Sequence, residues 1–385
     1  MLPTVSSTNK PVKPRFPFLD LKAQFATIRA EVMEAVTRVL ESQVFILGAE
    51  VDAFEREFAP LAGGGLAISC ASGTDALLLA LMALDVGAGD EVIVPPFTFV
   101  ATAGVVARLG AKPVFVDIDA ATYNLDPALL EEAITPRTRA MIPVHLFGLA
   151  ADMDAILAIA RRHRVSVIED AAQAVGARYR GKPVGNLGNI GCFSFFPSKN
   201  LGGAGDGGML TTMDPSAADR LRVLRMHGSR SKYDYELLGI NSRLDALQAA
   251  ILRVKQRYLE QWTSARQRNA ATYIRLFEEH GLKDKVRLPM VPPDRVHVFH
   301  QFVIGVRNRD ALRAHLQDEG FPTEIYYPSP LHLQPAFRNL GYQRGDFPRA
   351  EAACEEVLAL PIFPELREDQ QRELISAISD FAALI

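Results

Sequence analysis

Short apolar runs alternate with longer helical stretches over much of the chain. From residue 66 onward the apolar runs read LAIS, EVIVP, KPVFVDI, RAMIPVH and VSVIED, and segments with helical periodicity separate them. Strands that are apolar on both faces and separated by helices predict a mostly parallel sheet covered by helices on both sides. Ligands bind such sheets beyond the carboxyl ends of the strands, so we expect the functional residues there.

The flanking regions are predicted to be helical. Residues 21–42 carry apolar side chains at helical spacing, and a second helix is expected at about 49–61. One long helix is expected over about 242–280, where an apolar stripe runs along the first half. The residues of this stripe are Leu244, Leu247, Ile251, Val254 and Tyr258.

The pattern predicts two domains. Beyond residue 282 a strand, a helix and a strand follow, FHQFVIGV, RDALRAHLQDEG and TEIYY, which is typical of an α+β domain. We therefore expect a flexible N-terminal arm over 1–15, a large domain over 16–281 that includes the long helix, and a smaller C-terminal domain over 282–385.

Composition narrows the class of protein. The 385 residues include 42 Lys and Arg against 45 Asp and Glu, and a net charge of -3 offers no broad basic face for nucleic acid or an anionic membrane. No apolar run has the length of a membrane span. The three cysteines are scattered without CxxC spacing, which argues against a disulfide framework and a zinc site and favours a reducing cytoplasm.

One lysine stands in an unusual setting. Lys199 lies in CFSFFPSKNLGGAGDGGML, residues 192–210, between a run of aromatics and a run of glycines. Such surroundings would lower its pKa from about 10.4 by desolvation. The glycine run matches GxGxxG formally, but MLTT after it predicts a strand where a dinucleotide site needs a helix. We interpret it as a turn through which the backbone passes close to a bulky group.

Two segments suggest binding of a charged ligand. Ser72-Gly73-Thr74-Asp75 precedes the apolar helix ALLLALMAL, so its amides could receive a phosphate, although taken alone the segment is more typical of a simple N-cap by Ser72 or Thr74. In VIEDAAQAVG, Asp170 ends a buried strand and could hold a positively charged ring nitrogen. An N-cap or a metal ligand are the alternatives, but no second metal ligand stands at suitable spacing.

An aromatic residue that could stack on a flat ligand ring completes the set of predicted contacts. PPFTFVATA places Phe97 and Phe99 after another strand end, where an aromatic could stack on a heteroaromatic ring or simply belong to the core. A phosphate cradle, a stacker, a carboxylate for a ring nitrogen and a desolvated lysine together indicate pyridoxal 5'-phosphate, bound as a Schiff base on Lys199.

Several longer motifs resemble the DegT/DnrJ sugar aminotransferase family. They are FSFFPSKNLGGAGDGGM, ASGTDALLLAL, VIEDAAQAVGA, PPFTFVATA, NSRLDALQAAILRVK and YYPSPLHLQPAFRNLGYQRGDFPRAE, and the resemblance runs from about residue 16 to the C-terminus. It implies an α/β, aspartate aminotransferase-like fold (PLP fold type I), with a large cofactor-binding domain and a smaller C-terminal one. It also implies a homodimer with shared active sites.

The resemblance implies roles for individual residues. Lys199 would carry the cofactor and move the proton, Asp170 would pair with the pyridine nitrogen, and Gln173 would contact the ring hydroxyl. Phe97 would cover one face of the ring. The phosphate would be held by Gly73, Thr74 and Ser194 of one chain and Asn241 of the partner chain. The residues similar to those that contact the substrate are Arg243, Tyr326, Tyr327 and His332. For Arg243, a surface pair with Asp245 or Asp206 is the alternative.

The implied reaction moves an amino group from L-glutamate to a keto sugar linked to a nucleotide. Lys199 argues against the family's sugar dehydratases, which carry histidine at this position. FPSKNLG, GDGG and NSRLDALQAA look closer to enzymes that aminate C3 than to the 4-amino branch. A keto-cyclitol aminotransferase of aminoglycoside type and a non-catalytic regulator that keeps the fold are the alternatives.

Overall fold

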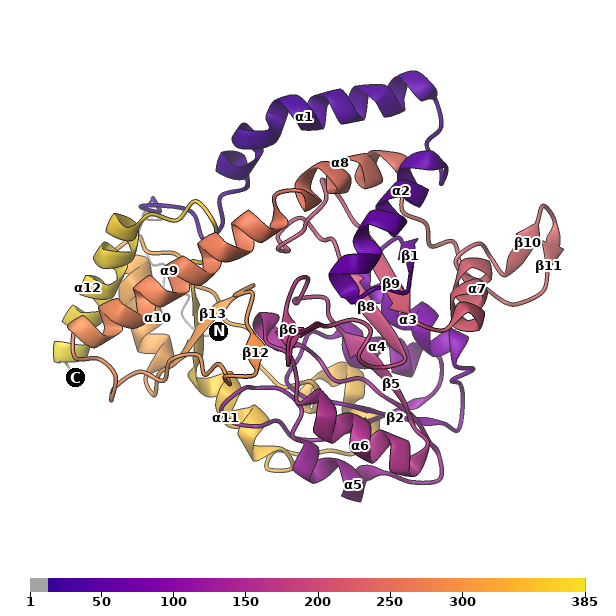
Figure 1. The fold of residues 1–385 in the computed structure, drawn as a ribbon. Coiled ribbons are helices and arrows are strands. Elements are labelled where there is room, and N and C mark those ends of the chain that lie inside the picture. The colour runs from indigo at the N-terminus through magenta and orange to yellow at the C-terminus, as the bar shows by residue number, and fades with distance from the viewer. Residues whose placement is uncertain (1–12, 385) are drawn as a thin grey trace, which may run out of the picture.

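The structure, a computed structural model, describes residues 13–384, so most of the predicted arm at 1–15 lies outside the described residues. Figure 1 shows its elements. The α-helices are α1 (Leu21–Ser42), α2 (Ala49–Phe58), α3 (Gly73–Ala83), α4 (Ala101–Arg108), α5 (Leu130–Ala133), α6 (Met153–His163), α7 (Pro215–Leu224), α8 (Ala246–Gln256), α9 (Leu259–Glu279), α10 (Arg309–Asp318), α11 (Pro348–Glu356) and α12 (Glu368–Leu384). No described helix is long and apolar enough to cross a membrane.

The strands form one large sheet and three small ones. They are β1 (Leu66–Cys70), β2 (Glu91–Val94), β3 (Lys112–Phe115), β4 (Thr138–Met141), β5 (Ser166–Asp170), β6 (Arg178–Tyr179), β7 (Lys182–Pro183), β8 (Ile190–Ser194), β9 (Gly208–Thr212), β10 (Ser229–Ser231), β11 (Asp234–Tyr235), β12 (Arg295–Val296), β13 (Phe302–Gly305) and β14 (Val357–Leu360). The large sheet has the order β1-β9-β8-β5-β4-β2-β3, and only β9 pairs antiparallel with its neighbours.

Helices cover both faces of this sheet. Along β2, Val92 and Val94 belong to one buried core, which also contains residues of α3, α4 and α7. Ile93 points to the opposite core, formed with α2, α6 and α8. This alternation explains why the strands read as continuous apolar runs: both faces of the sheet are buried.

The predicted long helix is two helices. Asp245 caps α8 by accepting a hydrogen bond from the Gln248 amide at 2.8 Å, which places the helix start at residue 246. At the other end, the amides of Arg257 and Tyr258 bond carbonyls three residues back, at 3.3 and 3.0 Å. These tighter turns end α8 before α9 begins. The apolar stripe continues across the break, so hydrophobic periodicity alone did not reveal it.

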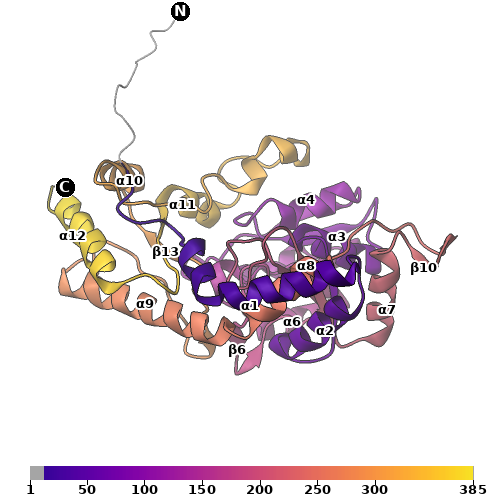
Figure 2. The ribbon, with the colours of Figure 1, turned by 90° about the horizontal axis from the view of Figure 1, so that it is seen from above.

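The chain ends pack against different parts of the molecule. Helix α1 lies along α8, as Figure 2 shows from above. The apolar stripe of α1 is buried there against residues of α8. A separate core joins α9, α10, α12, β13 and β14, and Phe16 packs into it. Arg15 also lies there, over the ring of Phe321. The segment before α1 and the C-terminal region are therefore connected by packing, and the division at residue 282 stays a prediction.

Candidate active site

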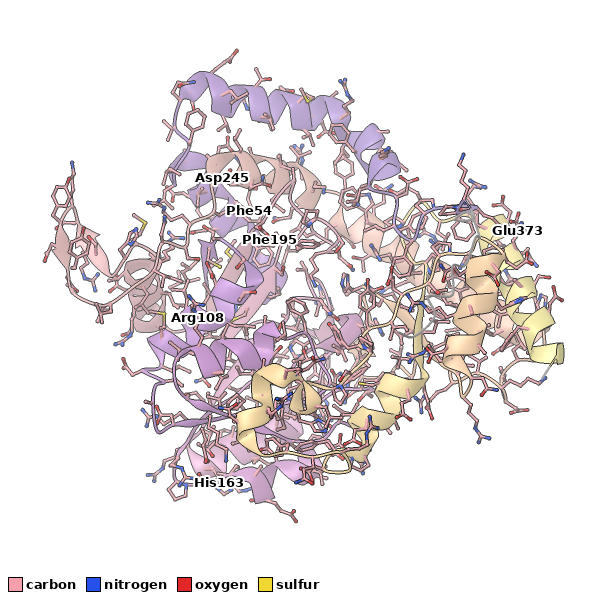
Figure 3. All side chains as sticks on the ribbon, turned by 180° about the vertical axis from the view of Figure 1, so that it is seen from behind. Phe54, Arg108, His163, Phe195, Asp245 and Glu373 are labelled. Atoms are coloured by element: carbon pink, nitrogen blue, oxygen red, sulfur yellow. The ribbon has the colours of Figure 1, made fainter. Side chains whose placement is uncertain are left out.

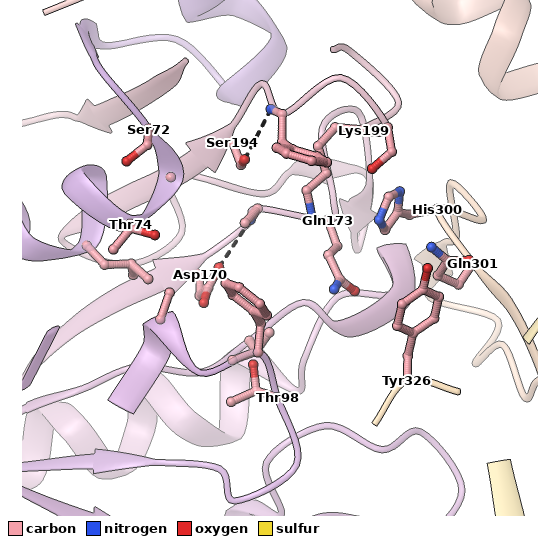
Figure 4. Close-up of a pocket in the computed structure, with 18 of the residues that line it drawn as sticks. Ser72, Thr74, Thr98, Asp170, Gln173, Ser194, Lys199, His300, Gln301 and Tyr326 are labelled. Carbon is pink, nitrogen blue, oxygen red and sulfur yellow. Dashed lines mark hydrogen bonds between the residues drawn. The ribbon is translucent and has the colours of Figure 1, made fainter. Parts of the chain in front are cut away.

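A cavity of about 450 Å³ opens at the carboxyl end of β5. Figure 4 shows it closely, and Figure 3 shows the side chains of the whole molecule from behind. Six residues predicted to bind the cofactor line it, namely Gly73, Thr74, Asp170, Gln173, Ser194 and Lys199. Tyr326 and Tyr327, predicted to contact the substrate, line it as well. The fold therefore brings together segments that lie more than 250 residues apart in sequence.

The start of α3 forms one end of the cavity. Ser72 caps the helix, because its hydroxyl accepts a hydrogen bond from the Asp75 amide at 3.0 Å. Thr74 has no side-chain hydrogen bond within the described residues, and its hydroxyl is free to bind a ligand. A Cβ at Gly73 would lie 2.7 Å from Cβ of Ser194, so only glycine fits between helix and strand. The positive end of the helix dipole favours an anion here.

Asp170 lies at the end of β5 and is 5% exposed. Oδ2 accepts a hydrogen bond from the Thr102 hydroxyl at 2.8 Å, and Oδ1 accepts one from the Ala172 amide at 3.2 Å. Burial raises the pKa of this carboxyl, while the Thr102 bond and the charge of Lys199 lower it. No helix follows for it to cap, and no group of residues in the described part of the chain could hold a metal ion.

Lys199 follows β8 in a turn, where its amide donates to the Phe196 carbonyl at 2.8 Å. Burial lowers the pKa of its amine to about 8, against the opposing effect of the Asp170 charge. A substantial fraction of the amine is therefore neutral near physiological pH, as a nucleophile requires. The glycine run after it lies against α8, where Gln248 accepts a hydrogen bond from the Ala204 amide at 2.8 Å.

The amide of Gln173 is held in one orientation. Oε1 accepts a hydrogen bond from the Phe147 amide at 2.6 Å, and Nε2 donates to the Tyr327 hydroxyl at 3.1 Å. Phe147 adopts a positive φ of 58°, in a turn before Gly148. The amide nitrogen of Gln173 is thus the group available to a ligand.

The prediction that Phe97 covers the cofactor ring needs correction. Phe97 is 1% exposed and packs among Tyr123, Phe147 and Tyr327, so it belongs to the core and does not line the cavity. Phe99 lines the cavity and is 56% exposed. The chain turns after β2, so the earlier ring points inward and the later one to the cavity.

His332 also lies away from the cavity. It is buried beside Phe347 and hydrogen bonds Oε1 of Glu351 through Nε2, at 3.1 Å. This contact holds the turn between Gln343 and Phe347, because the Glu351 carboxylate also accepts from the Gly345 amide at 2.8 Å. His332 is therefore a packing residue, and the prediction that it contacts substrate is wrong for this chain's own cavity.

The segment with Asn241 and Arg243 lies outside the cavity walls. Ser242 between them is buried, donates to Oδ2 of Asp75 at 2.8 Å and accepts from the Ala71 amide at 3.0 Å. Asn241 is exposed, and Arg243 forms no ion pair among residues 13–384, so the surface pair with Asp245 or Asp206 is not formed. Their predicted roles depend on a partner chain and stay predictions.

Sequence reasoning missed several cavity residues. Thr98, His300 and Gln301 line the cavity, and Thr102 lies directly behind Asp170. His300 bonds Asn200 at 3.2 Å, and burial holds the pKa of its imidazole well below the usual value. The 98–102 spacing at the start of a helix after a strand end was a usable signal for the two threonines. For His300 we find no comparable signal.

Comparisons with known proteins show the family to which the chain is similar. The model of the DegT/DnrJ/EryC1/StrS aminotransferase family matches residues 26–379. A Geobacillus stearothermophilus protein named pleiotropic regulatory protein is 52% identical over 365 residues, which are 95% of this chain and 98% of that protein. The UDP-N-acetyl-3-dehydro-alpha-D-glucosamine 3-aminotransferase of Acidithiobacillus ferrooxidans is 50% identical and covers 94% of this chain and 96% of its own.

The fold is likewise similar to solved structures. The crystal structure of DesV from S. venezuelae in complex with a ketimine intermediate aligns with a TM-score of 0.93 at 47% identity, over 96% of this chain and 99% of that one. The predicted aspartate aminotransferase-like α/β fold and the family resemblance are both confirmed. The chain belongs to the DegT/DnrJ/EryC1/StrS aminotransferase family.

Proposed function

We propose that the protein is a pyridoxal 5'-phosphate-dependent aminotransferase that moves an amino group from L-glutamate to a nucleotide-linked keto sugar, at C3. The observation that carries the proposal is one cavity in which Lys199, with a pKa of about 8, lies near the buried carboxylate of Asp170. An amine and a carboxylate in this setting suit a cofactor with a reactive carbonyl and a basic ring nitrogen.

The residues present fit this cofactor. The α3 N-terminus with Gly73 and Thr74, together with Ser194, offers amides and hydroxyls to a phosphate. The space that a Cβ at Gly73 would fill lets the helix start approach Ser194 closely. Phe99 offers an exposed ring on the cavity wall for stacking.

The remaining contacts complement the ring. Asp170 retains acceptor capacity on both oxygens, since a carboxylate has about four lone-pair sites and only two donors are present. It would hold the proton of the ring nitrogen. The oriented Nε2 of Gln173 would donate to the ring hydroxyl.

Bound there, the cofactor supplies an electron sink and carries the amino group from donor to acceptor. Lys199 would hold the cofactor through its Nζ and, as a neutral amine, would transfer the proton at the substrate carbon. Asp170 would keep the ring nitrogen protonated. Tyr326 and Tyr327 line the wall of the cavity that the sugar would reach.

The substrate class rests on relatives. The Acidithiobacillus enzyme at 50% identity is named for a 3-dehydro sugar linked to UDP, and this supports a nucleotide-linked sugar aminated at C3. The regulatory name of the Geobacillus relative favours the alternative of a non-catalytic regulator. The presence of both Lys199 and Asp170 supports catalysis over this alternative.

We also propose a homodimer with shared sites. Large apolar side chains are exposed at the cavity lip, where Phe99 is 56% and Phe196 is 53% exposed. Asn241 lies on an exposed segment anchored by Ser242 to the α3 start. A second chain would cover the lip and bring its own Asn241 toward the phosphate, as a sedimentation measurement of the holoprotein would test.

The proposed function is tested by visible absorption of the purified protein with pyridoxal phosphate. We expect a violet absorption band, which makes the protein yellow, to be lost on addition of L-glutamate and to return with a UDP- or dTDP-linked 3-keto sugar, with the amino sugar detected by mass spectrometry. Lys199→Ala should fold, show no such band and give no turnover. A wild-type protein without a band would support the regulator, and turnover of a free keto-cyclitol but not of the nucleotide sugar would support the other alternative.

A further inference from the structure

Two threonines form a buried hydrogen-bonded chain behind Asp170. The Thr102 hydroxyl lies 2.8 Å from Oδ2 of Asp170 and 3.1 Å from the Thr98 hydroxyl. Thr102 is 0% and Thr98 is 3% exposed. Thr98 also lines the cavity, so the chain runs from the cavity wall to the far side of the carboxylate. Figure 4 labels Thr98 and Asp170 in the cavity wall.

The direction of the chain follows from its chemistry. An ionised carboxylate only accepts hydrogen bonds, and each hydroxyl has one hydrogen to donate. Thr102 therefore donates to Asp170, and Thr98 donates to Thr102. A protonated Asp170 would permit the opposite order. The hydrogen bond from Thr102 favours the charged carboxylate, because it lowers the pKa of Asp170 against the effect of burial.

The hydroxyl of Thr102 is not used by its own helix. A threonine inside a helix commonly bonds the carbonyl four residues back. Thr102 lies in the first turn of α4 but its hydroxyl contacts β5, which is 68 residues away in sequence. A purely local helix role does not account for this contact.

We propose that Thr102, oriented by Thr98, is a positioning residue that keeps Asp170 charged and holds its free lone pairs toward the cavity for the ring nitrogen of the cofactor. The inference rests on the proposed function and deepens it. Two other groups, Lys199 and His145, lower the pKa of Asp170 through their charge. The charge of Asp170 in turn raises the pKa of Cys192 and Tyr327. Among the side chains of residues 13–384, only Thr102 donates a hydrogen bond to its carboxylate.

The test compares one variant of Thr102 that replaces the hydroxyl with one that removes only the methyl group. Thr102→Val keeps the shape and removes the donor, while Thr102→Ser keeps the donor. The readouts are the ¹⁵N chemical shift of the ring nitrogen in holoprotein reconstituted with ¹⁵N-labelled pyridoxal phosphate, and kcat. The matched control is Thr211→Val, because Thr211 is equally buried but its hydroxyl donates to the Gly185 carbonyl at 2.6 Å, away from the cavity.

We expect Thr102→Val to move the ring-nitrogen signal toward the unprotonated value and to lower kcat by about 10- to 100-fold, the effect of one hydrogen bond to a charged group. Thr102→Ser should behave as the wild type, and Thr98→Val should shift the signal in the same direction by less. Thr211→Val should leave the signal unchanged.

A wild-type signal and kcat in Thr102→Val would overturn the proposal, as would a Thr102→Ser variant as impaired as Thr102→Val. If Thr102→Val does not fold, Thr98→Val decides the question by the same signal. Failure of the proposed function looks different: wild-type protein would then show no bound, labelled cofactor at all.

Discussion

Two consecutive carboxylates on β5, Glu169 and Asp170, point to opposite sides of the sheet and have opposite surroundings. Glu169 is 0% exposed and accepts four hydrogen bonds: from Nε2 of His145 at 2.9 Å and from the amides of Gly185, Leu187 and Gly188 at 2.8, 2.7 and 2.7 Å. Asp170 is nearly as buried but accepts only two.

The difference separates a structural carboxylate from a functional one. Four donors use the full acceptor capacity of Glu169, whose role is to hold the 185–188 turn against the sheet. His145 supports this as a donor, because its Nδ1 accepts from the Ala151 amide at 3.1 Å and its hydrogen is therefore on Nε2. Asp170 lines the cavity and can still accept further hydrogen bonds. Burial combined with incomplete hydrogen bonding therefore distinguishes the site residue from the structural one.

The same change, carboxylate to amide, should have different effects at the two positions. Asp170→Asn should lower kcat/KM by about 10²- to 10⁴-fold, since an amide cannot hold the ring nitrogen's proton. Far-ultraviolet circular dichroism and the unfolding midpoint of the cofactor-free protein should not fall, because the change removes a buried charge. Turnover equal to the wild type would remove Asp170 from the site.

At the neighbouring position the loss should appear in stability. Glu169→Gln places an NH₂ group against donors and removes the charge they bind, so we expect the free energy of unfolding to fall by about 3–5 kcal/mol. Urea titration of the cofactor-free protein measures this. The control is Glu131→Gln at an exposed pair with Arg162, which should change little. An unaltered midpoint in Glu169→Gln would contradict the structural role.

Much of the fold followed from the sequence, because strands buried on both faces and helices with one apolar stripe leave clear patterns. The helix break at Arg257 and Tyr258 did not, since it depends on two tightened turns and not on a glycine or proline. The packing of Phe16 with the C-terminal region was equally hidden, because it joins segments hundreds of residues apart.

In the site, the place of residues near strand ends could be predicted from the sequence. Which side chain faces the cavity could not be predicted where the backbone path after a strand decides it. Lys199, Asp170 and the Ser72 to Thr74 segment follow from topology, because carboxyl ends of parallel strands meet at one edge. Phe97 and Phe99 carry the same side chain, and only the backbone path after β2 decides which one faces the cavity. In sequence His332 is similar to residues that contact the substrate, but in the structure its imidazole hydrogen bonds Glu351.

The contrast between the carboxylates also predicts a pH dependence. Burial raises the pKa of Asp170 in the folded cofactor-free protein. Because the pKa of Asp170 is higher in the folded than in the unfolded state, its protonated carboxyl contributes stability below the unfolded pKa, near 3.9. This contribution is lost as the pH rises through the folded pKa. Asp170→Asn should therefore gain stability relative to its parent as pH rises through this window, then level off.

This measurement is made in a Lys199→Met background, because the lysine charge favours the ionised carboxylate and its own pKa of about 8 lies in the titration. Thermal unfolding midpoints of Lys199→Met and Lys199→Met with Asp170→Asn are compared between pH 4 and 8. We expect the unfolding midpoint of the double variant to rise relative to that of Lys199→Met as the pH rises. If its advantage instead became smaller, the folded state would favour the charged carboxylate even without cofactor.

The smallest expected effect concerns the two phenylalanines, which repeat the same contrast between core and cavity. Phe97→Leu should cost about 1.5 kcal/mol or less of unfolding free energy and leave cofactor affinity unchanged, because Phe97 only packs among other rings. Phe99→Leu should leave stability unchanged and weaken the cofactor by about 2- to 10-fold, the worth of one aromatic stacking contact. Cofactor titration followed by protein fluorescence measures the affinity. If Phe97→Leu weakened binding while Phe99→Leu did not, the ring of Phe97 would support the cofactor site indirectly, and exposure at the cavity wall would no longer distinguish site residues from core.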